Sequence, residues 1–122
     1  MAKTILITGA TDGIGLETAR LLVAAGHTVL LHGRSATKLA SVEATLSALP
    51  GAGTVETFLA DLSDLAAVDA LADAVTARHP RLDVLINNAG VFRTPDPLTA
   101  DGMDVRFVVN TLAPYRLTQR LL

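Results

Sequence analysis

Short apolar runs alternate with longer stretches of helical spacing along this chain, and this alternation restricts its fold more than any other feature. Four runs are predicted as strands: Thr4–Ile7, Thr28–Leu31, Thr54–Leu59 and Leu82–Ile86. Strands that alternate with helices of about 10 to 15 residues pair in parallel through right-handed crossovers, with helices on both faces of the sheet. The order βαβαβαβα therefore predicts an α/β fold with a doubly wound parallel sheet.

Glycine and serine residues mark the ends of the predicted helices. The first helix is predicted at Gly13–Ala25 with Gly26 as its stop. Ser35 and Ser63 are predicted to cap the second and third helices, because a serine hydroxyl accepts a hydrogen bond from the first turn. The face of the first helix that we expect to turn inward consists of Ile14, Thr18, Leu21, Leu22 and Ala25.

Composition excludes several classes of function. The 122 residues, which we predict to form one domain (1–122), carry 10 Lys+Arg against 12 Asp+Glu and no Cys. A net charge of −2 lacks the excess of positive charge that is typical of nucleic-acid-binding proteins. No apolar stretch approaches the roughly 20 residues of a membrane span, and the three His residues are too scattered for a metal site. We expect a cytoplasmic globular chain that binds neither nucleic acid nor membrane and holds no metal.

A glycine-rich turn lies between the first predicted strand and the first predicted helix. Gly9 allows a tight turn, Gly13 lets the backbone approach a pyrophosphate, and Gly15 lets the helix pack closely on the sheet. The free N–H groups and the dipole of the helix N-terminus favour phosphate there. We therefore predict a dinucleotide site that includes Gly9, Thr11, Asp12, Gly13, Ile14 and Gly15. The alternative is an ordinary glycine-rich loop.

The spacing Thr-Gly-x-x-x-Gly-Ile-Gly of this turn resembles the cofactor signature of the short-chain dehydrogenase/reductase family. Three later segments are similar to that family in order and spacing: Asp61-Leu62, Asn87-Asn88-Ala89-Gly90 and Val109-Asn110. The resemblance extends from Lys3 to the last residue, and the stretch from Asn110 to Tyr115 looks most like retinol-dehydrogenase-like members. It implies a Rossmann-type sheet of strand order 3-2-1-4, incomplete relative to a full domain of the family.

The resemblance also implies roles for the later segments. Asp61 would accept a hydrogen bond from the adenine amino group, while the Leu62 N–H donates to a ring nitrogen. The backbone of Asn88, Ala89 and Gly90 would line the adenosine ribose. Two alternatives stay open: Asp61 as an acid that flanks a helix cap, and Asn side chains that only tie neighbouring strands together.

The residues after the second predicted strand bear on which nicotinamide cofactor binds. An NAD site usually places a carboxylate about 20 residues beyond the third glycine. Arg34 and Ser35 stand there instead, and a guanidinium offers a planar fork of donors to a 2′-phosphate. We therefore predict NADP(H), with NAD or a merely solvated Arg34 as alternatives. Asp12 counts against NADP(H), because many NADP-using members of the family carry a basic residue at its position.

A fourth helix is predicted from about Ala100, after a loop at Thr94–Pro97. Pro114 lies four residues after Asn110 and has no N–H, so the Asn110 carbonyl needs another donor, for which we expect a water. The family resemblance implies that this Asn holds a water of a proton relay, and Asn110 is our catalytic candidate. A proline kink without function is the alternative.

The Ser and Tyr-x-x-x-Lys that the resemblance implies beyond Asn110 do not occur in this sequence, whose single Tyr115 is followed four residues later by Gln119. We expect Tyr115 to serve core or interface packing. The chain is predicted to be the cofactor-binding portion of an NADP(H)-dependent oxidoreductase for an alcohol or carbonyl substrate, inactive by itself. A non-catalytic NAD(P)-binding or sensing module is the alternative, and a homo-oligomer is left open. We also expect the last helix to expose Val108, Val109 and Leu112.

Overall fold

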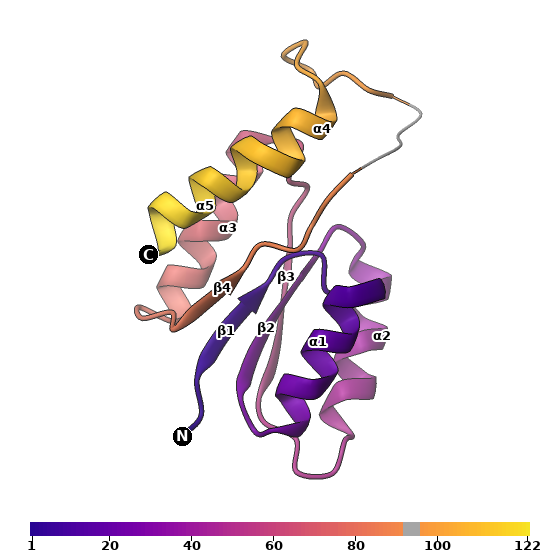
Figure 1. The fold of residues 1–122 in the computed structure, drawn as a ribbon, viewed down its shortest axis with the longest axis vertical. Coiled ribbons are helices and arrows are strands. Elements are labelled where there is room, and N and C mark those ends of the chain that lie inside the picture. The colour runs from indigo at the N-terminus through magenta and orange to yellow at the C-terminus, as the bar shows by residue number, and fades with distance from the viewer. Residues whose placement is uncertain (92–95) are drawn as a thin grey trace.

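The computed structural model describes residues 1–91 and 96–122, so the predicted loop at Thr94–Pro97 falls partly outside the described residues. It contains a four-stranded parallel sheet with helices on both faces (Figure 1). The strands are β1 (Thr4–Ile7), β2 (Thr28–Gly33), β3 (Val55–Leu59) and β4 (Val84–Ile86). The helices are α1 (Gly13–Ala24), α2 (Ala36–Ser47), α3 (Leu65–Arg78), α4 (Val105–Phe107), the π-helical η1 (Val108–Leu112) and α5 (Ala113–Leu121). The strand order β3-β2-β1-β4 confirms the predicted Rossmann-type sheet.

The pleat of the two central strands gives the sheet two apolar faces. Leu6 of β1 pairs in register with Leu30 of β2, and both side chains lie in the same buried cluster. The opposite face carries Ile5, Ile7, Val29 and Leu31. Successive residues of a strand point to opposite faces, so a sheet covered on both sides needs apolar residues at every position of its central strands. This requirement explains the continuous apolar runs of the sequence.

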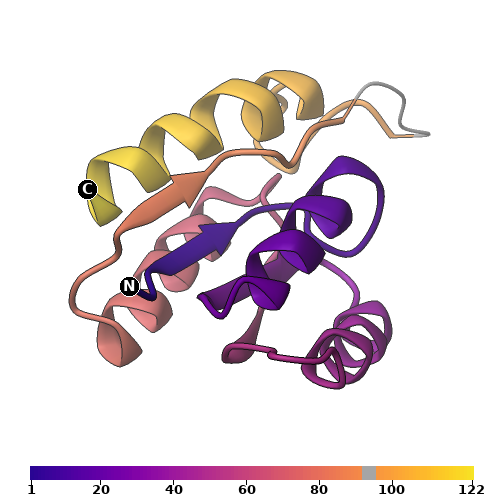
Figure 2. The same ribbon diagram turned by 60° about the horizontal axis from the view of Figure 1, so that its bottom comes forward.

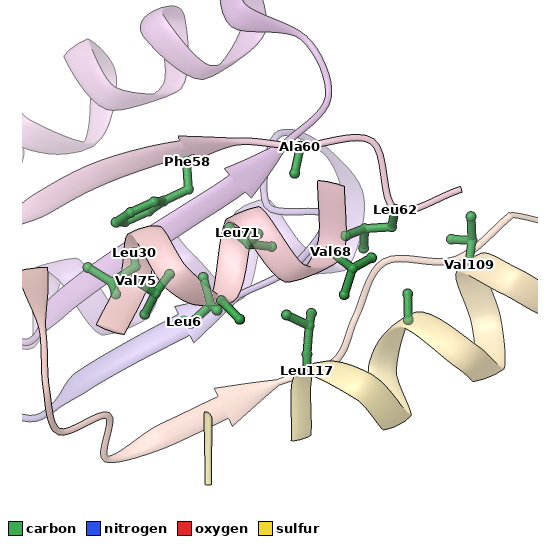
Figure 3. Close-up of a cluster of buried hydrophobic side chains, with 12 residues drawn as sticks. Leu6, Leu30, Phe58, Ala60, Leu62, Val68, Leu71, Val75, Val109 and Leu117 are labelled. Atoms are coloured by element: carbon green, nitrogen blue, oxygen red, sulfur yellow. The ribbon is translucent and has the colours of Figure 1, made fainter. Parts of the chain in front are cut away.

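A different pair of helices covers each face of the sheet (Figure 2). α1 and α2 lie on the face of Ile5 and Ile7, where Val23, Leu39 and Leu46 are buried. α3 and α5 lie on the face of Leu6 and Leu30. Figure 3 shows the cluster that they form there, with Val68, Leu71 and Val75 from α3 and Leu117 from α5. The core therefore consists of two layers, one on each side of the strands.

Ion pairs orient α5 against α3. The Arg116 guanidinium donates to both carboxylate oxygens of Asp69, at 2.8 and 3.0 Å. One turn further, Arg120 donates to Asp73 at 2.8 Å. These side chains are exposed to solvent, and exposed ion pairs contribute little free energy. The apolar contacts beneath them therefore supply most of the stability of this helix pair.

The inward face of α1 differs from the predicted one. Its buried residues are Gly15, Ala19 and Val23, whereas Ile14 and Leu21 are 79% and 62% exposed. The predicted face was therefore wrong. Small residues four positions apart form a narrow stripe that lets the helix lie close to the strands, and large side chains in that stripe would hold it away.

Two helix starts also differ from the predictions. Asp64 rather than Ser63 caps α3, and its carboxylate accepts a hydrogen bond of 2.9 Å from an N–H of the first turn. The last helical stretch begins at Val105 rather than near Ala100, and the carboxylate of Asp104 caps it. Both caps are aspartates one residue before the helix, which satisfy N–H groups of the first turn that lack a partner within the helix.

The last helical stretch widens into a π-helical turn ahead of Pro114. The Ala113 N–H donates to the Val108 carbonyl, five residues earlier in the chain. Such a turn accommodates a proline, whose ring and missing N–H disrupt the α-helical pattern. Val108 and Val109 are 0% and 6% exposed, so the expectation that they lie on the surface was wrong. Val109 belongs to the same buried cluster as residues of α3 and α5.

The helices of this chain are short. They range from three residues in α4 to 14 residues in α3. Within residues 1–91 and 96–122, none combines the length and the apolar character that crossing a membrane requires.

We predict that Leu117→Ala lowers the free energy of unfolding by about 2–5 kcal/mol, because it empties a fully buried position between α5 and the sheet. Leu21→Ala is the matched control: it deletes the same atoms at a position of α1 that is 62% exposed, and should change that free energy by less than about 0.5 kcal/mol. Urea unfolding followed by circular dichroism measures both. Equal losses would contradict the packing described above.

Candidate functional site

A cavity of about 390 Å³ lies at the carboxyl ends of the strands. It is lined by most of the predicted site residues: Gly9, Thr11, Asp12, Gly13, Ile14, Arg34, Ser35, Asp61, Leu62, Asn88, Ala89 and Gly90. Residues that were not predicted as site residues also line it: His32, Gly33, Lys38, Ala60, Val91 and Val109. In open α/β sheets, ligands bind at this edge where the strand order reverses, as it does here between β1 and β4. The topology thus gathers four separate motifs into one cavity.

The glycine turn packs against the segment that follows β4. A Cβ atom on Gly9 would lie 2.9 Å from the Ala89 Cα, and Gly9 also has a φ of +64°. A Cβ on Gly15 would overlap the Gly9 carbonyl oxygen. Gly13 has open space around it, but its φ of +56° is a conformation that side-chain-bearing residues rarely adopt. The turn therefore needs Gly9 and Gly15 for close approach and Gly13 for its backbone conformation.

The N-terminus of α1 opens into the cavity without a side-chain cap. Asp12 occupies the N-cap position and makes no side-chain cap hydrogen bond, whereas Ser35 and Asp64 cap α2 and α3. Gly13 and Ile14, in the first turn, line the cavity. The first N–H groups of a helix lack partners within it, and the helix dipole makes this end positive. The cavity therefore presents hydrogen-bond donors that suit an anion.

The buried hydroxyl of Thr8 ties β1 to the segment after β4. Its Oγ1 atom accepts hydrogen bonds of 3.0 Å from the backbone N–H groups of both Asn88 and Ala89. The Asn88 side chain reaches back and donates to the carbonyl of Gly9 at 2.9 Å. Asn88 therefore ties neighbouring strands together, which was one of the alternatives for this motif, while its residue also lines the cavity.

Two cations stand at the end of the cavity near α2. Arg34 follows β2, and Ser35 caps α2 by accepting the Lys38 N–H at 3.3 Å, which confirms the predicted cap. Lys38 Nζ lies 3.8 Å from a carboxylate oxygen of Asp12. Both of these side chains are largely exposed, so water screens their attraction and the pair contributes little free energy. This end of the cavity therefore carries one acid and two cations.

Asp61 is held in a local turn at the end of β3. Its Oδ1 atom accepts hydrogen bonds from the Ser63 N–H at 2.9 Å and from the Ser63 hydroxyl at 2.7 Å. Partial burial raises the pKa of the Asp61 carboxyl, but these bonds and the charge of Arg34 outweigh burial and hold the pKa below its ordinary value. Asp61 is therefore an anion at neutral pH. Ser63, which was predicted to cap α3, orients this carboxylate instead.

His32 is a residue of the cavity that the sequence-based prediction missed. It is 3% exposed, and its ring bridges the Gly9 N–H and the Ala60 carbonyl oxygen, at 3.0 and 2.9 Å. Burial lowers the pKa of His32, although the Ala60 carbonyl and the nearby Asp61 oppose that shift. A signal was present in the sequence: this His directly extends the apolar run of β2, where a polar ring needs partners.

Gly15 and Asn110 are the predicted site residues that do not line the cavity. Gly15 lies beneath the turn, while Asn110 holds a segment that does line it. The Asn110 side-chain oxygen accepts the Val91 N–H, and its Nδ2 donates to the Val91 carbonyl, both at 2.8 Å. The sequence drew attention to the backbone carbonyl of Asn110, but the side chain makes these contacts.

The strand order, the glycine turn and the uncapped helix behind it define a Rossmann-type nucleotide-binding fold. A family model described as short chain dehydrogenase matches residues 3–122. The chain therefore belongs to the short-chain dehydrogenase family.

Individual proteins of known sequence or structure agree with this assignment. The chain is 43% identical over 117 residues to the uncharacterized oxidoreductase AN7799 of Emericella nidulans, across 93% of this chain and 44% of that protein. It is 39% identical to retinol dehydrogenase 12 of Bos taurus, across 98% of this chain and 38% of that protein. A metagenomic short-chain oxidoreductase, solved in complex with NADP, matches with 38% identity and a TM-score of 0.84, across 98% of this chain and 54% of that one. The chain thus spans roughly half or less of each.

We predict that Thr8→Val lowers the free energy of unfolding by about 1–3 kcal/mol, because it removes the buried hydroxyl and leaves the part-buried Ala89 N–H without its acceptor. Thr8→Ser keeps the hydroxyl and is the control. Its loss of unfolding free energy should reflect only the missing methyl group. Urea unfolding measures the stability, and hydrogen exchange of the Ala89 amide should quicken in the Val variant alone. Slow exchange in both variants would show that the hydroxyl does not hold this segment.

Proposed function

We propose that the chain binds NADP(H) and is the cofactor-binding portion of an NADP(H)-dependent oxidoreductase that transfers hydride to or from an alcohol or carbonyl group. The observation that carries this proposal is the N-terminus of α1, which has no side-chain cap and opens into the cavity behind the glycine turn. Its N–H groups and dipole suit the diphosphate of a dinucleotide. Membership of the family and the NADP in the related metagenomic structure support the same assignment.

The remaining cavity residues suit the adenosine half of such a ligand. We assign the backbone of Asn88, Ala89 and Gly90 to the ribose, because small residues there leave room beside the turn. Asp61 is assigned to the adenine amino group and the Leu62 N–H to a ring nitrogen. Since Ser63 occupies Oδ1 of Asp61, the other carboxylate oxygen is the one available to adenine.

The charges near α2 support NADP(H) rather than NAD(H). Arg34 lines the cavity and can present two donors to a 2′-phosphate, and the Ser35 hydroxyl is adjacent. Asp12 counts against this assignment in the sequence. Lys38 offsets it, because its ammonium lies 3.8 Å from the Asp12 carboxylate and lines the same cavity. Lys38 therefore offsets part of the Asp12 charge, while the charge of Arg34 lowers the pKa of the nearby Asp61 carboxyl.

The reaction rests on the bound cofactor, whose nicotinamide supplies or accepts a hydride. Asn110 positions the chain after β4 by holding both backbone groups of Val91, and we propose that it contributes to catalysis through that segment. Tyr115 is 64% exposed on α5, so it does not pack in the core, and we assign it no proton transfer. An alcohol or carbonyl substrate is supported by the relative named retinol dehydrogenase 12.

Arg34→Ala should weaken NADPH binding by about 10- to 100-fold and leave NADH binding unchanged, because hydrogen bonds to a charged group contribute about 1.5–3 kcal/mol. Arg81→Ala removes a guanidinium whose side chain is 92% exposed and does not line the cavity, and it should change neither affinity. Fluorescence titration with each cofactor gives the two dissociation constants. If Arg34→Ala keeps the parent's ratio of NADPH to NADH affinity, Arg34 does not read the 2′-phosphate.

Gly13→Asp should abolish NADPH binding, because it places a carboxylate at the helix N-terminus where the diphosphate is assigned. Gly26→Asp is the matched control at the other end of α1: this glycine also has a positive φ and open space around it, so the cost of the backbone conformation is similar. Isothermal titration calorimetry compares both with the parent chain. The proposal fails if the parent gives no heat with NADPH, or if Gly13→Asp binds as the parent does.

A further inference from the structure

The side chain of His32 connects the ends of three strands beneath the cavity. It stands at the carboxyl end of β2, is 3% exposed and lines the cavity. Its Nδ1 atom lies 3.0 Å from the Gly9 nitrogen after β1, and its Nε2 atom lies 2.9 Å from the Ala60 carbonyl oxygen after β3. The backbone carbonyl of His32 also accepts the Ala10 N–H, at 2.9 Å. One residue thus accepts hydrogen bonds from two successive N–H groups of the glycine turn.

These partners determine the protonation of the ring. Gly9 N–H can only donate, so Nδ1 accepts and carries no proton. The Ala60 carbonyl can only accept, so Nε2 carries the proton and donates. The hydrogen-bond network therefore assigns a neutral ring in the Nε2–H tautomer. A protonated ring would turn an N–H toward the Gly9 N–H and lose that hydrogen bond.

The two bonds fix the distance between the parts of the cavity assigned to different ends of the ligand. Gly9 begins the turn that leads to the N-terminus of α1, and Ala60 precedes Asp61. An apolar residue at position 32 would fill the space but leave the part-buried Gly9 N–H and the buried Ala60 carbonyl without partners. The ring therefore sets both the position of the turn and its separation from the end of β3.

We propose that His32 is a positioning residue for the dinucleotide: in its neutral Nε2–H form it holds the glycine turn and the Asp61 segment at the separation that the cofactor requires. This inference rests on the proposed function, because it assigns the diphosphate to that turn. Cofactor affinity then depends on the charge of His32 as well as on groups that touch the ligand.

The contribution of His32 changes with pH in a defined direction. Burial holds the pKa of His32 below its ordinary value of about 6.5, against the Ala60 carbonyl and the charge of Asp61. The other charged groups at the cavity are Arg34 from the end of β2, Asp12 from the turn and Lys38 from α2. The folded state favours the neutral ring. The stabilising contribution of His32 is therefore complete above about pH 6.5 and declines as the pH falls below that value.

Two substitutions separate the two hydrogen bonds of the ring. His32→Asn places an amide oxygen near the position of Nδ1 and can still accept the Gly9 N–H. His32→Gln places its amide near the position of Nε2 and restores only the bond to Ala60. We expect His32→Asn and His32→Gln each to bind NADPH about tenfold more weakly than the parent, because each breaks one end of the link between the turn and the end of β3, and a lost hydrogen bond costs about 1.4 kcal/mol or a factor of 10.

His27 offers a matched control. Its Nδ1 atom also accepts a backbone N–H, from Lys3 at 3.0 Å, but it lies before β2 and does not line the cavity. His27→Gln should leave the NADPH affinity unchanged. Circular dichroism on each full-chain variant establishes that it is folded, and nitrogen NMR of the parent's imidazole rings reports the His32 tautomer directly, whether or not the variants fold.

The pH profile of NADPH affinity completes the test. A 2′-phosphate itself titrates near pH 6, so the informative quantity is the difference between the parent and His32→Asn, in which the ligand's own titration cancels. We expect the parent to lose more affinity than His32→Asn between pH 7.5 and pH 5. Parallel profiles, a parent-like affinity in His32→Gln, or an Nδ1–H tautomer would overturn this inference alone. A parent chain that binds no NADPH would overturn the proposed function with it.

Discussion

Close backbone contact between the glycine turn and the segment after β4 shapes everything else at the carboxyl edge of the sheet. The contact depends on Gly9, since a Cβ there would press on Ala89, and it is held by polar side chains from three strand ends. Thr8 accepts two N–H groups of the β4 segment, Asn88 donates to the Gly9 carbonyl, and the His32 ring accepts the Gly9 N–H. The turn is thereby held in a positive-φ conformation by its neighbours. A ligand that binds there therefore loses no binding free energy to ordering of the turn.

Charge is distributed over the cavity in a way that suits a ligand with more than one kind of group. The α1 N-terminus offers neutral donors, the α2 end offers Arg34 and Lys38, and the β3 end offers the carboxylate of Asp61. Asp61 stays ionised because Ser63 and Arg34 lower its pKa, whereas His32 stays neutral because it is buried. The cavity thus holds cationic and anionic side chains together, and Arg34 is near enough to Asp61 to lower the pKa of its carboxyl.

Local chemistry made the strands and the glycine motifs predictable, while packing between elements did not follow from the same patterns. The apolar runs of β1 and β2 required coverage on both faces, and helices cover both. The strand order, which the family resemblance implied, was also confirmed. The inner face of α1 was wrong because small residues form it, and hydrophobic size alone favoured Ile14 and Leu21. Val108 and Val109 were expected on the surface, but both are buried, and Val109 lies in the same cluster as residues of α3 and α5.

The sequence by itself determined the order of strands and helices along the chain, the glycines at the turn, and most of the candidate residues that line the cavity, because each depends on residues close together in the chain. Only the tertiary structure decided that His32 bridges Gly9 and Ala60, that Lys38 approaches Asp12, and that the Asn110 side chain holds Val91. These contacts join residues from different strands and helices. Their geometry arises when parallel strands bring their carboxyl ends to one edge, and no spacing along the chain encodes it.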